Sequence, residues 1–148
     1  MSDAARALLV TALASGTGFA WLAWRAARED AGSPQRLVAE LRLAQVAALL
    51  LAFVAAPYVG FAAAAPSGTG LDVAVAIGFF VIAAVAPTRD PHEALTILAL
   101  AFPGHALVDI LHRPGLLPVG VVPGWYLVGC AVYGVGVGAL CYLPLLKR

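Results

Sequence analysis

Residues 43–65 read LAQVAALLLAFVAAPYVGFAAAA, a run of 23 residues without a charged side chain. A helix needs about 20 predominantly apolar residues to cross the roughly 30 Å hydrocarbon core of a bilayer. Only helices and closed barrels satisfy their backbone polar groups inside lipid, and this run lacks the alternation typical of barrel strands. It therefore predicts a transmembrane helix.

Four more apolar stretches have the same character, and they cover residues 7–24, 71–87, 94–112 and 124–146. The stretch at 71–87 is the shortest, near the lower limit of about 17 residues for a span. Together with 43–65 they predict an all-α, polytopic membrane helix bundle of about five transmembrane helices. We expect residues 1–148 to form this bundle as a single domain.

The composition excludes a soluble globular protein. Of the 148 residues, 62% are hydrophobic and only 11% are charged, against about 25% charged in soluble domains. The mean hydropathy of +0.93 agrees, and the lipid bilayer is the expected surrounding. A net charge of +1 gives no indication of a nucleic-acid partner. Cys130 and Cys141 lie about 16 Å apart along one predicted helix, too far for a disulfide, and are interpreted as small core residues.

The basic residues predict the orientation, because Lys and Arg collect on the cytoplasmic side of a membrane. With the N-terminus outside and the C-terminus cytoplasmic, two basic residues lie outside, Arg6 and Arg113. Seven then lie inside: Arg25, Arg28, Arg36, Arg42, Arg89, Lys147 and Arg148. The reverse orientation inverts this count. We therefore expect a multi-pass protein of the cell inner membrane with its N-terminus outside.

The segment richest in chemistry is HALVDILH at residues 105–112. His105, Asp109 and His112 are spaced i, i+4 and i+7, which places them on one face of a helix. A charged side chain inside a bilayer costs about 2.5–3.5 kcal/mol even on the lenient insertion scale, so such residues indicate a functional site by default. We expect all three to face the bundle interior, with Tyr133, Tyr58 or the histidines as partners of Asp109.

Four interpretations of this stripe remain open. His105, Asp109 and His112 are candidate ligands of a divalent metal, zinc or non-haem iron, with Glu40, Asp72 and Glu93 the scarce further donors. The stripe is also suited to passing protons, because histidine titrates near neutral pH. It is equally suited to binding a polar ligand group in an apolar pocket. The fourth interpretation is a hydrogen-bonded cluster that only fixes helix packing.

Small residues predict where helices approach closely. Gly134 and Gly138 form a small-xxx-small pair in the last span, of the kind that lets two helix backbones meet. We expect this pair to face another helix, either in the same chain or in a second copy or another membrane protein.

Several motifs in order resemble an uncharacterised family of small bacterial multi-pass membrane proteins, a domain of unknown function. They are YVGFA at 58–62, HALVDILH at 105–112, PGWY at 123–126 and CAVY at 130–133. The similarity covers roughly residues 55–145. The family often has Asp where this chain has Gly134 and Trp where it has Val108, so a family site that used the extra carboxylate would be incomplete here. The resemblance implies a membrane fold and supplies no activity.

The sequence thus favours a small binding or accessory membrane protein that uses its His/Asp stripe. One alternative is a metal-dependent intramembrane enzyme acting on lipid, and another is a structural subunit of a larger membrane complex. Whether the protein is an enzyme, and which ligand or cofactor it takes, is not fixed by the sequence.

Overall fold

The computed structural model describes residues 3–65, 69–112 and 122–146, and in these ranges the chain is helical with no strands. The five α-helices are α1 (Asp3–Ala26), α2 (Pro34–Ala64), α3 (Gly70–Val85), α4 (Pro91–Leu111) and α5 (Gly124–Tyr142). Two 3-10 turns, η1 (Ala86–Thr88) and η2 (Leu143–Leu146), follow α3 and α5. The all-α bundle is therefore confirmed.

Within the described residues, five helical segments are long and apolar enough to cross a membrane. The surface supports the same conclusion, because large apolar side chains point outward: Leu49, Leu100 and Val132 are each more than 70% exposed. Such a surface is unfavourable in water and suits contact with lipid. Arg113, Lys147 and Arg148, which enter the charge count, lie outside the described residues.

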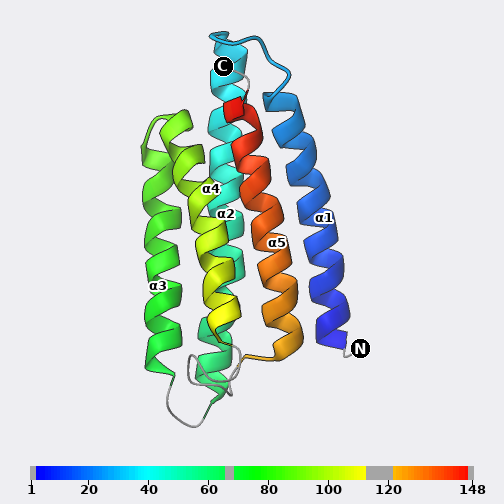
Figure 1. Cartoon of the computed structure of the whole chain (residues 1–148), viewed down its shortest axis with the longest axis vertical. Coiled ribbons are helices and arrows are strands. Elements are labelled where there is room, and N and C mark those ends of the chain that lie inside the picture. The colour runs from blue at the N-terminus through cyan, green and yellow to red at the C-terminus, as the bar shows by residue number, and fades with distance from the viewer. Residues whose placement is uncertain (1–2, 66–68, 113–121, 147–148) are drawn as a thin grey trace.

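The helices stand side by side, with α3 at one edge and α1 at the other (Figure 1). The most extensive contact is between α4 and α5, while α2 packs on α3, α4 and α1. The start of α1 and the end of η2 lie at opposite ends of the bundle (Figure 1), as an odd number of crossings requires.

The helices α2 and α4 each begin just after a residue whose side chain caps the helix N-terminus. The Ser33 hydroxyl accepts from the Arg36 backbone N–H and Pro34 occupies the first turn of α2. The Asp90 carboxylate accepts from the N–H groups of His92 and Glu93 at the start of α4. Side-chain caps and first-turn prolines are typical of helix N-termini.

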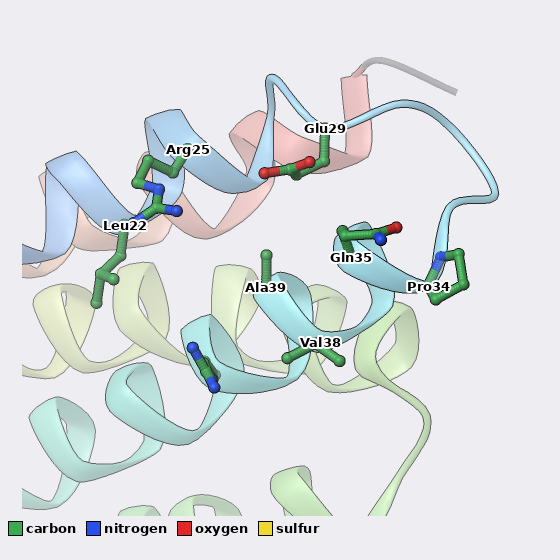
Figure 2. A pocket seen from close by; sticks show the side chains of 8 residues that line it. Leu22, Arg25, Glu29, Pro34, Gln35, Val38 and Ala39 are labelled. Carbon is green, nitrogen blue, oxygen red and sulfur yellow. The ribbon is translucent and has the colours of Figure 1, made fainter.

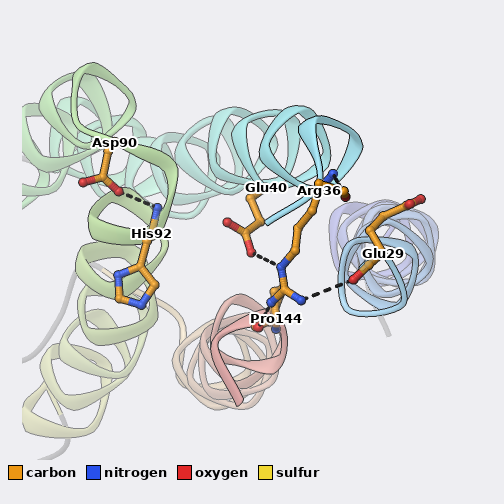
Figure 3. A network of polar contacts seen from close by, with 7 residues as sticks. Glu29, Arg36, Glu40, Asp90, His92 and Pro144 are labelled. Carbon is orange, nitrogen blue, oxygen red and sulfur yellow. Dashed lines mark hydrogen bonds and ion pairs between the residues drawn. The ribbon is translucent and has the colours of Figure 1, made fainter. Parts of the chain in front are cut away.

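α2 begins at Pro34, ahead of the apolar stretch predicted from residue 43. The additional turns carry Arg36 and Glu40, which are buried rather than placed in a connection. Arg36 Nε donates to Glu40 Oε1 at 2.8 Å, and its other nitrogens donate to the Pro144 carbonyl at 2.6 Å and the Glu29 carbonyl at 3.3 Å (Figure 3). Through these hydrogen bonds Arg36 joins α2 to η2 and to the α1–α2 connection. Glu40 is thus the partner of Arg36 and is not near the His/Asp stripe.

Two glycines of α5 allow its backbone to approach α4 closely. A Cβ on Gly138 would lie 2.9 Å from Pro103 Cδ and 3.1 Å from the Ala99 carbonyl oxygen, and one on Gly134 would lie 3.2 Å from the Phe102 carbonyl oxygen. Pro103 has no N–H to donate to the Ala99 carbonyl, and α5 packs closely against this turn of α4. The prediction that Gly134 and Gly138 face another helix is confirmed, and in this chain that helix is α4.

Candidate functional site

The predicted stripe on α4 faces the bundle interior. His105 and Asp109 are each 1% exposed and His112 is 5% exposed. Residues at i, i+4 and i+7 share a helix face, and this face of α4 is turned toward α2, α3 and α5. The prediction that all three side chains are buried is therefore confirmed.

Asp109 lies between two partners. The Tyr58 hydroxyl on α2 donates to Asp109 Oδ1, and His105 Nδ1 lies 3.3 Å from Asp109 Oδ2. Each carboxylate oxygen therefore has a polar neighbour, which reduces the cost of placing a carboxyl group among apolar side chains. Tyr58 is also central to the aromatic packing, since its ring meets those of His105, His112 and Tyr126 edge-on.

His112 belongs to a separate pair. Its Nε2 lies 2.7 Å from Asp72 Oδ1 on α3, and its Nδ1 lies 2.7 Å from the Val108 carbonyl oxygen. A carbonyl only accepts, so Nδ1 carries a proton, and Nε2 and Asp72 share a second proton in one hydrogen bond. The pair ties the end of α4 to the start of α3. Sequence reasoning placed Asp72 merely at a span end.

Cys130 is the component that sequence reasoning missed. Its Sγ lies 3.9 Å from His105 Nδ1, and one ligand atom each from His105, Asp109 and Cys130 lie within 4.8 Å of one another. His112 is not part of this group, in which a thiol from α5 stands beside the imidazole and carboxylate of α4. The CAVY motif was the available signal, because it begins at Cys130.

Tyr133, the other predicted partner of Asp109, lies elsewhere. Its hydroxyl is 2.9 Å from Ser15 Oγ, so it joins α5 to α1. Tyr126 is the tyrosine of α5 that approaches the cluster, and its hydroxyl donates to the Val54 carbonyl at 2.9 Å. We name Tyr58, His105, Asp109, Cys130 and Tyr126 the polar cluster.

The polar cluster occupies one half of the bundle. Every buried position of α2 from Leu43 to Ala55 is apolar, and so is every buried position of α4 from Ala94 to Phe102. These layers separate the polar cluster from the Arg36–Glu40 pair. A proton path across the whole bundle would have to cross this apolar region, so the arrangement does not favour the proton-relay hypothesis.

An apolar groove of about 620 Å³ lies beside the polar cluster. Residues of α1, α2 and α5 line it: Ala5, Leu8, Leu9, Ala12, Phe53, Val54, Pro57, Trp125, Tyr126, Gly129, Cys130 and Tyr133. The volume is in the usual range of ligand pockets. His105 and Asp109 do not line the groove, but Cys130 and Tyr126 contribute both to its wall and to the polar cluster.

A second cavity, of about 390 Å³, lies where α1 ends and α2 begins (Figure 2). Arg25, Glu29, Gln35 and Arg42 line it together with Leu22, Pro34, Val38 and Ala39. Arg25 and Arg42 are exposed, as basic residues at helix ends near a membrane surface usually are. This cavity is at the opposite end of the bundle from the polar cluster.

No family model, no curated protein and no solved structure matches the chain. The resemblance to the uncharacterised membrane family therefore stays a prediction. Function has to be inferred from the geometry of the polar cluster and the apolar groove.

Proposed function

We propose that the protein is a small membrane-embedded binding protein that holds the apolar chain of a lipid-like amphiphile in the groove between α1, α2 and α5. The observation that carries the proposal is the groove itself, which adjoins the polar cluster through Cys130 and Tyr126. A polar group that enters the apolar groove would find the hydrogen-bonding side chains of Tyr126 and Cys130 at this wall, which would orient the ligand.

The lining favours a lipid chain. Apolar contacts along the groove come from Leu8, Leu9, Phe53 and Val54. Room for the lipid chain comes from the small residues Ala12 and Gly129. Trp125, in the first turn of α5, is 46% exposed at the end of the groove. Tryptophans prefer the level of the lipid headgroups, so we place the ligand's polar head near Trp125 and its chain along α1.

A groove-filling substitution tests this proposal. A Cβ on Gly129 meets no atom within 4 Å, so Gly129→Phe should extend a ring into the groove without disturbing the backbone. Gly136→Phe is the matched control, because Gly136 is also on α5, has the same free space and does not line the groove. Native mass spectrometry of both variants and the wild type would measure bound lipid.

We expect lipid to remain on the wild type and Gly136→Phe and to be lost from Gly129→Phe. Equal lipid retention by all three proteins would refute the groove as the binding site. Copurification of another membrane protein that Gly129→Phe releases would favour the accessory or structural-subunit alternative instead.

A lipid-acting enzyme is the second candidate, favoured by the close approach of His105, Asp109 and Cys130 beside the groove. It predicts that lipids incubated with the wild type change in mass, while Asp109→Asn, which should keep the fold, leaves them unchanged. Lipid mass spectrometry that finds no product from either protein would exclude it for the lipids supplied.

For location, we propose the inner membrane of a bacterial cell, with the N-terminus outside. The distribution of basic residues supports the orientation, and the resemblance to a bacterial membrane family supports the compartment.

A further inference from the structure

We propose that His105, Asp109 and Cys130 form a zinc site inside the bundle. This inference goes beyond ligand binding in the groove and does not depend on it. The site differs from the one expected from sequence, because Cys130 on α5 takes the place of His112 on α4.

The distances suit zinc. Zinc binds nitrogen and oxygen at about 2.0–2.2 Å and sulfur at about 2.3 Å, so tetrahedral ligand atoms are separated by roughly 3.3–3.7 Å. In the structure His105 Nδ1 is 3.3 Å from Asp109 Oδ2 and 3.9 Å from Cys130 Sγ. All three ligand atoms lie within 4.8 Å of one another, so bound zinc would draw them together by about 1 Å or less. Imidazole, carboxylate and thiolate are all ordinary zinc ligands.

The charge balance also suits a divalent ion. A bound metal takes Cys130 as a thiolate and Asp109 as a carboxylate, and these two negative charges neutralise Zn²⁺. A neutral complex avoids leaving a net charge among apolar side chains, which would be costly at this burial. His105 completes three protein ligands, the number typical of zinc sites that keep the fourth position for water or another ligand.

The surroundings hold the ligands in place. The Tyr58 hydroxyl donates to Asp109 Oδ1, which leaves Oδ2 directed toward His105. The Phe79 ring packs on the His105 ring at 4.7 Å between centroids. Hydrogen bonds from outer-shell groups orient ligating carboxylates in metal sites, and the Phe79 ring restricts the orientation of the His105 ring. His112 is held away by Asp72 and Val108.

The chain offers a matched control for the thiol. Cys130 and Cys141 are the two cysteines of the sequence, and both are buried on α5. Cys141 lies outside the group of potential ligands. Cys141→Ser therefore removes a buried thiol from the same helix and should leave the proposed site intact.

Elemental analysis of protein purified without chelator tests the proposal. We expect about one zinc per chain in the wild type and in Cys141→Ser, and at least a tenfold loss in Cys130→Ser and His105→Gln. Zinc retention by Cys130→Ser at the wild-type level, or a metal-free wild type after dialysis against zinc, would overturn the proposal.

Cobalt substitution keeps the test decisive if Cys130→Ser does not fold. Co²⁺ bound by a thiolate gives an intense charge-transfer absorption, and in Cys141→Ser only Cys130 can supply that thiolate. We expect the absorption in Cys141→Ser loaded with cobalt. Its absence there would rule out Cys130 as a ligand, whatever the groove binds.

Discussion

Tyr58 is the residue that makes the buried carboxyl group of Asp109 tolerable, because its hydroxyl is the donor to Oδ1 while His105 faces Oδ2. Tyr58 and Asp109 are each 1% exposed. Tyr58→Phe keeps the ring and its aromatic contacts and removes only the hydroxyl.

We expect Tyr58→Phe to lower the free energy of unfolding by about 1–3 kcal/mol, the cost of leaving a buried polar group without a partner. Denaturant unfolding in detergent would measure it. Tyr142→Phe is the control, since Tyr142 is 53% exposed and should tolerate the change. Equal stability of both variants would mean that the Tyr58 hydroxyl does not stabilise Asp109.

The His112–Asp72 pair should show energetic coupling. The two groups are 2.7 Å apart and shielded from the surroundings, with side chains only 4% and 10% exposed. A double-mutant cycle with His112→Ala and Asp72→Ala should give a coupling free energy of about 0.5–3 kcal/mol. The exposed pair Arg6–Asp3, at 3.8 Å, should give almost none. Additive effects at His112 and Asp72 would contradict the pairing.

The candidate site could be predicted in part from sequence. The i, i+4, i+7 spacing placed His105, Asp109 and His112 on one buried face, because a helix repeats every 3.6 residues. Tyr58 was among the expected partners and is confirmed. Asp72 was one of three possible further donors and could not be assigned to His112, and Cys130 was not considered, because the periodicity of α4 does not say which residues of α3 and α5 it meets.

At the scale of helices, the contact between α4 and α5 depends on two glycines without room for a side chain. A Cβ on Gly138 would meet the Pro103 ring and the Ala99 carbonyl oxygen, neither of which is a flexible side-chain end. A Cβ on Gly136, two residues earlier, would meet nothing within 4 Å. The same chemical change therefore has opposite expected effects at the two positions.

Gly138→Ala should lower the free energy of unfolding by about 1–3 kcal/mol, because α5 must move away from α4. Gly136→Ala should be neutral or stabilising by up to about 1 kcal/mol, because alanine favours the helix over glycine. Thermal unfolding of both variants in detergent would measure the difference. A Gly138→Ala variant as stable as Gly136→Ala would show that α4 and α5 are not in close contact.

The helices themselves were more predictable than their packing and ends. Length and apolarity identify a span in lipid because the bilayer imposes both. The additional turns of α2 were missed, since Arg36 and Glu40 look like connection residues and only the fold shows them buried as a pair. Similarly, Tyr133 is an ordinary polar residue in the sequence, and its contact with Ser15 depends on where α1 packs.

At the scale of the whole molecule, the charge distribution predicts how the bundle is inserted. The α1–α2 connection and the C-terminal turn η2 lie at the same end and are joined through Arg36. Of the six basic residues that the structure describes, five belong to that end and one to the other: Arg25, Arg28, Arg36, Arg42 and Arg89 against Arg6. The positive-inside rule then predicts that this end lies in the cytoplasm.

Site-directed labelling would test the orientation in cells. Cys130 and Cys141 are buried and should not react, so a cysteine introduced at the exposed Ala31, in the α1–α2 connection, should react with a membrane-impermeant maleimide only after permeabilisation. A single cysteine introduced at Thr69, just before α3, should react in intact cells, because one crossing separates the two positions.

Replacing Arg25, Arg28 and Arg42 by glutamine leaves four basic residues on the predicted cytoplasmic side against two outside, so it should weaken this orientation preference without inverting it. Arg36 must stay, because it holds the bundle end together. Labelling of Ala31→Cys in intact cells, with Thr69→Cys protected, would establish the opposite orientation and place the polar cluster in the cytoplasmic half of the membrane.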